Sequence, residues 1–314
     1  MTAEDSESPR CPACASDFTR RWLNKGGYAH GRCNACGHGF VFPLPSQMTI
    51  DAYYRHLDSG LSSDASWQTE AGHKIQLWRD LLNRVEVASG RGPLLDLGCG
   101  GGQFLQLAAQ CGWSDATGVE PSPKAVALAR AAVTAPIYEG SWKDVSLSPS
   151  NFAAVALLDV LEHDRDPLGL LAHCFRLLRP GGSLLITVPN IRGLSIRCFG
   201  EGAYVVIPPE HLSYFTAKSL RLMLLKSGFA PPATFTCDLY LKEWLRFISR
   251  LRKGKPAASA STDGRSQYLK WHRRLSGGVA IHGIGVANTF LAALGCGDQL
   301  VAVARKPFGS PEHA

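Results

Sequence analysis

The chain has 314 residues, the length of about two domains at roughly 150 residues each. Apolar residues make up 45% of it, and 33 basic residues outnumber 26 acidic ones, giving a net charge of +7. This composition excludes a disordered, collagen-like or coiled-coil chain and a polytopic membrane protein. Ten cysteines without an export signal predict a reducing, cytoplasmic compartment rather than a secreted disulfide scaffold.

Two Cys-x-x-Cys pairs, 18 residues apart, stand near the N-terminus and consist of Cys11, Cys14, Cys33 and Cys36. Each pair makes a tight turn that aims two thiolates at one point, and two pairs complete a tetrahedron around zinc. Four free thiols or a redox pair are the alternative. Cysteine fills all four positions and leaves none for a catalytic water, so we predict structural Zn²⁺ in a zinc-ribbon-like module over residues 1–46. His30 and His38 are expected to be solvated loop histidines rather than ligands.

Residues 47–92 predict a helical connector. In the stretch IQLWRDLLNRV the apolar residues fall near one helical face, and they are Ile75, Leu77, Trp78, Leu81, Leu82 and Val85. Pro93 opens a different pattern, and we expect a third domain over residues 93–314.

Short apolar runs alternate with helical stretches from Leu94 to about Pro189. The predicted strands include LLDL, ATGVE, AAVALLD and SLLITVP, and QLVAVARKP predicts a final strand. The helix of LGLLAHCFRLL is expected to stop at the Pro-Gly-Gly of residues 180–182. Alternating strands and helices with nearly continuous apolar strands predict an α/β fold, a parallel sheet with helices on both faces.

The turn after the first of these strands is rich in glycine. It reads DLGCGGG from Asp96 to Gly102, and it lacks both the G-x-G-x-x-G spacing of a dinucleotide site and the Lys-Ser/Thr of a phosphate loop. Asp96 at the strand end suits a cationic ligand. Glu120 ends the next strand 24 residues later, where a carboxylate can accept hydrogen bonds from both ribose hydroxyls. The pattern predicts a ligand with a ribose, an ammonium and a sulfonium; a turn that serves only close packing is the alternative.

The segments LDLGCGGGQFL, GVEPSP, LDVLEHDRDP, LRPGGSLLITVPN and PEHLSYFT together resemble the class I S-adenosylmethionine-dependent methyltransferases. The resemblance covers about residues 94–235 and the last strand. It implies a Rossmann-like, seven-stranded, mostly parallel sheet with an antiparallel last strand, and S-adenosylmethionine as cofactor. A zinc-binding segment before such a core resembles the deoxysugar C-methyltransferases and related small-molecule methyltransferases.

The resemblance also implies a set of cofactor-binding residues: Asp96, Gly98, Gly100, Gly102, Glu120, Ser141, Trp142 and Asp159. Asp96 would lie near the methionine amino group, Glu120 would hold the ribose, and Asp159 would face the methionine or the acceptor. Many relatives carry an acid after the third strand, near the adenine amino group. Ser141 and Trp142 stand there instead, where Ser141 could accept a hydrogen bond and Trp142 could stack on adenine.

Methyl transfer to oxygen or carbon usually also needs a base to remove a proton. His211, with Glu210 beside it, follows the fifth strand, where this architecture carries groups that face the acceptor. The sugar C-methylating relatives have a Glu-His pair in a comparable place, but the histidine of P-E-H-L-x-x-F-T can also serve only to fix the loop. His163 and Asp164 are the other candidates.

Residues 241–297 predict a helical insertion before the last strand. Its first part, 241–275, carries ten Lys or Arg against Glu243 and Asp263, and LKEWLRFISRLRK is amphipathic. Contact with an anionic membrane surface, a lid that attracts a phosphate-bearing acceptor, and simple packing on the core all fit this pattern. For residues 276–297 we prefer a buried helix over a membrane-dipping one.

These features predict an S-adenosylmethionine-dependent methyltransferase that acts on a small molecule, such as a sugar, a nucleotide-sugar or a secondary metabolite. A quinone-type O-methyltransferase is one alternative, because its motifs are similar. An RNA methyltransferase that uses the zinc module and the basic insertion is another. Nucleic acid is the less favoured partner, since the zinc segment lacks a dense basic surface. A binding protein without turnover is the alternative from outside the enzymes.

Overall fold

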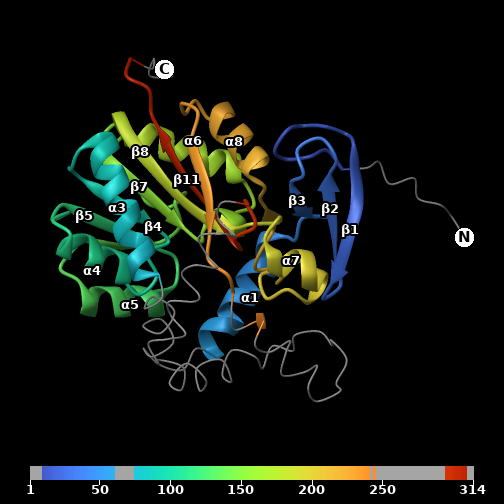
Figure 1. Cartoon of the computed structure of the whole chain (residues 1–314). Helices are drawn as coiled ribbons and strands as arrows, with labels where there is room; N and C mark the ends of the chain where they lie inside the picture. The colour runs from blue at the N-terminus through green and yellow to red at the C-terminus, as the bar shows by residue number, and fades with distance from the viewer. Residues whose placement is uncertain (1–8, 61–73, 241–242, 245–293, 310–314) are drawn as a thin grey trace, which may run out of the picture. The chain divides into compact units, whose positions relative to one another are not determined.

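The computed structural model describes residues 9–60, 74–240, 243–244 and 294–309 (Figure 1). The chain divides into two compact units, each built from separate stretches of sequence. One, here called the ribbon unit, comprises Met1–Asp51, Pro189–Met223 and Phe235–Leu300. The other, here called the sheet unit, comprises Ala52–Val188, Leu224–Thr234 and Val301–Ala314.

Seven strands form one sheet in the order β10-β11-β8-β7-β4-β5-β6. In chain order they are β4 (Leu94–Leu97), β5 (Ala116–Glu120), β6 (Ile137–Glu139), β7 (Phe152–Leu158), β8 (Leu178–Pro189), β10 (Ala233–Cys237) and β11 (Gln299–Arg305). Strand β4 is parallel to both β5 and β7, and the pairs β5–β6 and β7–β8 are parallel as well. The residue after β11 is hydrogen-bonded to the start of β8. The N–H of Lys306 donates to Gly182 O, and the N–H of Gly181 donates to Lys306 O. The Rossmann-like, mostly parallel sheet expected from the sequence is confirmed.

Helices flank this sheet: α3 (Ile75–Ser89), α4 (Gln103–Gln110), α5 (Pro123–Ala132) and α6 (Pro167–Leu177) (Figure 1). The local sequence explains where α5 and α6 begin. The Ser122 hydroxyl accepts the N–H of Ala125 before α5, and the Asp166 carboxylate accepts the N–H of Gly169 before α6. Both helices begin with proline, which tolerates the first helical turn.

The apolar face predicted for the connector is buried in α3 over Trp78, Leu81, Leu82 and Val85. Ile75 departs from the prediction, since it is 41% exposed in the first turn of the helix. The helix predicted to stop at residues 180–182 ends earlier. Helix α6 ends at Leu177, and Leu178 already belongs to β8. Pro180 and Gly181 therefore lie within the strand, and Gly181 has a φ of 76°, which glycine adopts without strain.

The ribbon unit contains a second sheet, in the order β1-β2-β3-β9. Its strands are β1 (Thr19–Lys25), β2 (Tyr28–Cys33), β3 (Gly39–Val41) and β9 (Ser213–Tyr214). The first three form an antiparallel meander between and beside the cysteine pairs. Strand β9 comes from a segment more than 170 residues later in the chain and adds antiparallel to β3, pairing Gly39 with Tyr214.

The remaining elements are α1 (Gln47–Gly60), the short turns η1 (Leu161–His163) and η2 (Gly200–Gly202), α7 (Leu194–Phe199) and α8 (Ala217–Lys226). Within the described ranges, no helix has both the length and the apolar character needed to cross a membrane. The insertion predicted for residues 241–297 lies outside the described residues, apart from 243–244 and 294–297.

Candidate functional site

Four neighbouring strands of the sheet unit end at one edge. Because β7, β4, β5 and β6 are parallel neighbours, their carboxyl ends lie side by side. Asp96 lies in β4, Glu120 ends β5, Asp159 follows β7 and Ser141 follows β6. The residues predicted from separate motifs therefore come together where ligands bind in open parallel sheets.

The glycine loop fits this edge for steric reasons. Gly98 has a φ of 79°, and a Cβ there would lie 2.5 Å from Val160 Cγ2. Gly102 precedes α4 with a φ of 83°, again in the left-handed region. Side chains at these two positions would strain the backbone, so the loop needs glycine to turn from β4 into α4.

Glu120 is buried and holds the loop in place. Its Oε2 accepts the N–H of Gly100 at 2.9 Å, and its Oε1 accepts the N–H of Ser122 at 2.9 Å. A carboxylate at the end of this strand is also the type of group that accepts hydrogen bonds from ribose hydroxyls. Glu120 therefore has a structural role in the loop in addition to the binding role predicted for it.

Asp96 is 2% exposed, and its Oδ1 has no hydrogen-bond partner among the described residues. Burial, and secondarily the charge of Glu120, raises the pKa of Asp96 to about 8. A buried carboxyl oxygen without a partner is costly unless something else satisfies it. An ammonium or sulfonium ligand would supply the missing partner and favour the ionised form.

Asp159 contacts Thr187 and Lys74, which no sequence motif linked to it. Its Oδ1 accepts the Thr187 hydroxyl at 3.0 Å, and the Lys74 ammonium forms an ion pair with Oδ2. Asp159 also has a φ of 58°, which is rare outside glycine and typical of functional sites. Thr187 lies within the predicted strand SLLITVP, but no motif pointed to Lys74 in the sequence.

Ser141 and Trp142 already have partners of their own. The Ser141 hydroxyl donates to Asp144 Oδ2 at 2.5 Å, and the Trp142 indole N–H donates to Asp164 Oδ2 at 2.5 Å. Gly140 N donates to Glu120 O at 3.0 Å, which places this turn beside the end of β5. The contacts with adenine expected of Ser141 and Trp142 stay predictions.

The donors and acceptors at this edge fit S-adenosylmethionine. Asp96 has a buried oxygen without a partner among the described residues, Glu120 places a carboxylate beside it, and the glycine loop brings backbone close to Glu120. When bound, the cofactor supplies a methyl group on a positively charged sulfur. The fold and this arrangement define the class I S-adenosylmethionine-dependent methyltransferases.

Cofactor binding near pH 7 is expected to release close to one proton from Asp96. With its pKa at about 8 the carboxyl is mostly protonated at that pH, and a bound cation lowers the pKa and drives the proton off. Calorimetric titrations in buffers of different ionisation enthalpy measure this release. The Asp96→Asn variant should bind more weakly and release no proton from this position; equal heats for the wild type in all buffers would contradict the assignment.

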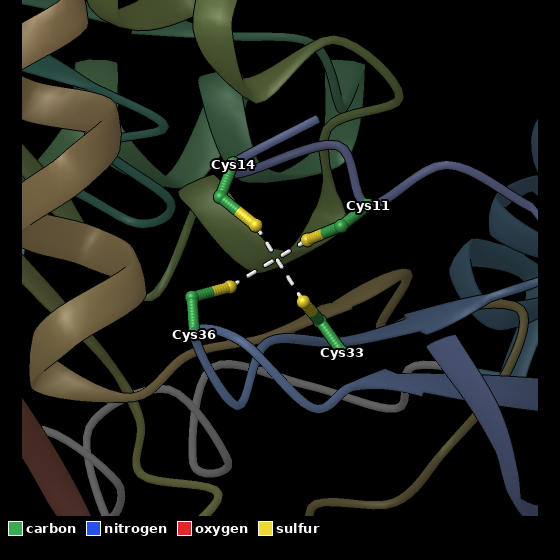
Figure 2. A group of neighbouring side chains, drawn as sticks. All are labelled: Cys11, Cys14, Cys33 and Cys36. Carbon is green, nitrogen blue, oxygen red and sulfur yellow. Dashed lines mark hydrogen bonds between the residues drawn. The ribbon is translucent and has the colours of Figure 1, made fainter. Parts of the chain in front are cut away.

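A second candidate site lies in the ribbon unit, where the four predicted cysteines converge (Figure 2). Cys11 Sγ lies 3.6 Å from Cys36 Sγ, and Cys14 Sγ lies 3.5 Å from Cys33 Sγ. All four sulfur atoms lie within 4.8 Å of one another. A tetrahedral site with Zn–S bonds of about 2.3 Å separates its sulfurs by about 3.8 Å, so the four thiols fit zinc. Hydrogen bonding to the Cys36 thiol lowers the pKa of Cys11 to about 5, toward the thiolate that a metal needs.

The histidines beside this cluster are not solvated, contrary to the prediction. His30 is 1% exposed and His38 is 0% exposed. His30 lies in β2, where its Nδ1 donates to Tyr28 O and its Nε2 lies 3.3 Å from the Tyr214 hydroxyl. His38 packs against Phe40 and Phe215, and burial lowers its pKa to about 3. Both side chains are buried because the segment around β9 packs on this sheet. The local sequence around the two histidines does not indicate that packing.

The same segment carries the candidate base and is tied to the cysteine turns. The Thr216 hydroxyl donates to Cys36 O at 2.9 Å, and the Lys218 ammonium donates to Ala35 O at 2.7 Å. Strand β9, just after His211, pairs with β3, just after Cys36. The segment that follows His211 is therefore anchored on the turn that contains Cys36.

His211 is 7% exposed, and its Nδ1 lies 2.7 Å from Val205 O. Because a carbonyl only accepts hydrogen bonds, Nδ1 carries the proton and Nε2 holds the lone pair of the neutral ring. This is the tautomer that a base acting through Nε2 requires. Glu210 is half-buried, and its charge helps raise the pKa of Tyr214, after the larger effect of burial. Tyr214, one of the tyrosines of this loop, is buried, with contacts to His30 and His211.

The predicted site residues thus divide between the two units. All eight candidates for cofactor binding lie in the sheet unit, whereas Glu210, His211 and the four cysteines lie in the ribbon unit.

Comparison with known proteins agrees with the class defined by the fold. A family model described as a methyltransferase domain matches residues 71–232, and the chain belongs to this family. The ubiquinone biosynthesis O-methyltransferase of Xanthomonas campestris pv. campestris (strain B100) is 34% identical over 159 residues, 47% of this chain and 66% of that protein. The protein of the same name from Cereibacter sphaeroides is 32% identical over 102 residues, 31% of this chain and 41% of that protein. The matches therefore span less than two thirds of the length of these relatives.

Among solved structures, the complex between the Haloferax volcanii Trm112 methyltransferase activator and the putative methyltransferase is similar in fold. The match has a TM-score of 0.52 at 18% identity and covers 85% of this chain and all of the matched chain.

Proposed function

We propose that this protein transfers a methyl group from S-adenosylmethionine to a small-molecule acceptor, a sugar, a nucleotide-sugar or a secondary metabolite, at oxygen or carbon. The observation that carries the proposal is the pair of carboxylates at one sheet edge. Asp96 has a buried oxygen without a described partner, and Glu120 is anchored by the glycine loop. Together they suit a ligand with a cationic amino acid end and a ribose.

In this proposal the protein contributes alignment and exclusion of water, because the reactive methyl group belongs to the cofactor. Asp96 binds the amino group, Glu120 binds the ribose hydroxyls, and Asp159 faces the methionine or the acceptor. His211 Nε2 removes the proton from the acceptor, with Glu210 beside it, and the bond to Val205 O holds the ring in the required tautomer.

We propose structural zinc at the four cysteines. The distances between the sulfurs support this assignment, and a segment of about 35 residues has too small a core to fold alone without such a centre. With four cysteine ligands the ion would have no open coordination position, so we assign it no part in the chemistry.

A quinone-type O-methyltransferase is the second candidate, and the names of the relatives favour it. The two candidates differ in the acceptor, and the residues proposed to bind the cofactor do not distinguish between these acceptors. The test is a methyl-transfer assay with radiolabelled S-adenosylmethionine and a panel of nucleotide-sugars, free sugars, catechols and prenylated phenols. Label on a sugar or nucleotide-sugar supports the first candidate, label on the phenols supports the second, and no transfer to any small molecule contradicts both.

A further inference from the structure

Two arginines face each other on neighbouring strands of the ribbon sheet. Arg20 in β1 lies directly opposite Arg32 in β2 in the antiparallel register. Residues so paired point to the same face with their Cβ atoms about 5 Å apart, and like charges in such pairs destabilise the sheet. The Arg32 guanidinium lies 5.7 Å from the centre of the Trp22 ring, which orients it as a cation–π pair.

A third arginine joins this pair. A Cβ on Gly39 would lie 2.7 Å from Ile191 Cδ1 and 3.1 Å from Trp22 Cζ3, so Ile191 and Trp22 meet over Gly39. Arg192 follows Ile191 and is exposed. The chain therefore brings the backbone of Arg192 to the side of the ribbon sheet on which Arg32 packs against Trp22.

The cluster has no counter-charge in the described part of the chain. None of its three guanidinium groups forms an ion pair there. Asp17, two residues before β1, is instead paired with Arg10 at 2.8 Å. Three cations that repel one another, one of them half-buried, lower the stability of the free protein unless an anion binds among them.

We propose that Arg20, Arg32 and Arg192 form a binding site for the phosphoryl groups of a small ligand, of which a diphosphate ester is the best fit. Guanidinium groups present forked donors that match phosphate oxygens in pairs, and three of them match the charge of a diphosphate better than that of a single carboxylate. The exposed groups, Arg20 and Arg192, can close on the ligand, whereas Trp22 keeps Arg32 in place.

A small ligand is favoured over a polymer or a membrane because the charges are concentrated in one cross-strand pair and its neighbour rather than spread along a surface. Trp22 also contacts Tyr214, whose ring contacts His211, so the cluster and the candidate base belong to one unit. The ligand we favour is therefore a phosphorylated acceptor. That identification rests on the proposed function, whereas the binding of diphosphate does not.

The experiment is a calorimetric titration of the full chain with inorganic pyrophosphate at low salt, without cofactor. We expect one binding event that weakens as salt rises, and a loss of affinity of about tenfold or more in each of Arg20→Gln and Arg192→Gln, the size of a charge-assisted hydrogen bond. Arg20→Gln should also raise the unfolding temperature of the free protein, because it removes the cross-strand repulsion.

The matched control is Arg21→Gln, one residue along β1 and on the opposite face of the sheet, where Arg21 pairs with Gly31. It makes the same charge change and should bind pyrophosphate as the wild type does. No heat with the wild type, or equal losses in Arg21→Gln and Arg20→Gln, would overturn the proposal. The proposal would also be overturned if the protein bound RNA or phosphatidylglycerol vesicles but did not bind pyrophosphate. Because no methyl transfer is measured, failure here leaves the proposed function to be judged by its own assay.

Discussion

Replacing His211 with alanine is expected to lower the rate of methyl transfer by about 10²–10⁴-fold while the affinity for S-adenosylmethionine stays unchanged. The expectation follows from the tautomer, since the bond from Nδ1 to Val205 O leaves the lone pair on Nε2. It also follows from the division of the chain, because the residues expected to bind the cofactor lie in the sheet unit and His211 does not. Single-turnover rates and calorimetric cofactor titrations measure the two quantities separately.

The His211→Asn variant distinguishes a base from a residue that only fixes the loop. An asparagine amide can donate to Val205 O in place of Nδ1, but it has no basic nitrogen. If His211 is the base, both variants lose turnover, the acidic limb of the pH–rate profile disappears, and added imidazole partly restores the alanine variant. If asparagine keeps the full rate, His211 is a loop residue and its catalytic assignment is wrong.

Loss of the metal from the cysteine centre is expected to abolish turnover but not cofactor binding. The β9 segment that follows His211 depends on this centre through Thr216, Lys218 and the pairing of β3 with β9. Structural zinc in isolated fingers contributes about 10–16 kcal/mol of binding energy that is also folding energy, so its removal should unfold the cysteine turns and release that segment. The sheet unit holds the cofactor-binding residues and should keep its affinity.

The double variant Cys33→Ser/Cys36→Ser tests this expectation, together with elemental analysis of the purified wild type. The near-ultraviolet circular dichroism of the protein should lose the contribution of Trp22, which packs against Tyr214 and His30. Cys198→Ser is the matched control, because Cys198 is exposed and lies in α7, outside the cluster. A wild type that is purified without metal and is fully active would contradict the structural role of zinc.

Much of the sheet unit could be predicted because its signals are local. Apolar runs with glycine turns place β4, β5 and β7 to within a few residues and also place the end of β8. Asp96 and Glu120 lie at one edge because parallel neighbours align their carboxyl ends. The end of α6 was less predictable. Leu178 adopts an extended backbone two residues before Pro180, and which residue turns first depends on pairing with β7 that the local pattern does not contain.

The features that could not be predicted join residues far apart in the chain. Strand β9 pairs with β3 and thereby buries His30 and His38, which the local sequence presents as polar loop residues. Lys74 reaches Asp159 across 85 positions, with no spacing rule to indicate it. The cysteine cluster is the exception, because zinc requires a fixed ligand geometry and the chain repeats the Cys-x-x-Cys spacing that supplies it.

Cofactor binding at the sheet edge can be measured by calorimetric titration of the purified full chain with S-adenosylhomocysteine, the demethylated cofactor. We expect one binding event per chain, and a loss of affinity of roughly tenfold or more in Glu120→Ala, because the acceptor for the ribose and the anchor of the glycine loop are lost together. Asp115→Asn, an exposed carboxylate just before the opposite end of β5, should bind as the wild type does. If the folded wild type gives no heat with this compound, or if Glu120→Ala binds it with unchanged affinity, this sheet edge does not hold the adenosyl cofactor.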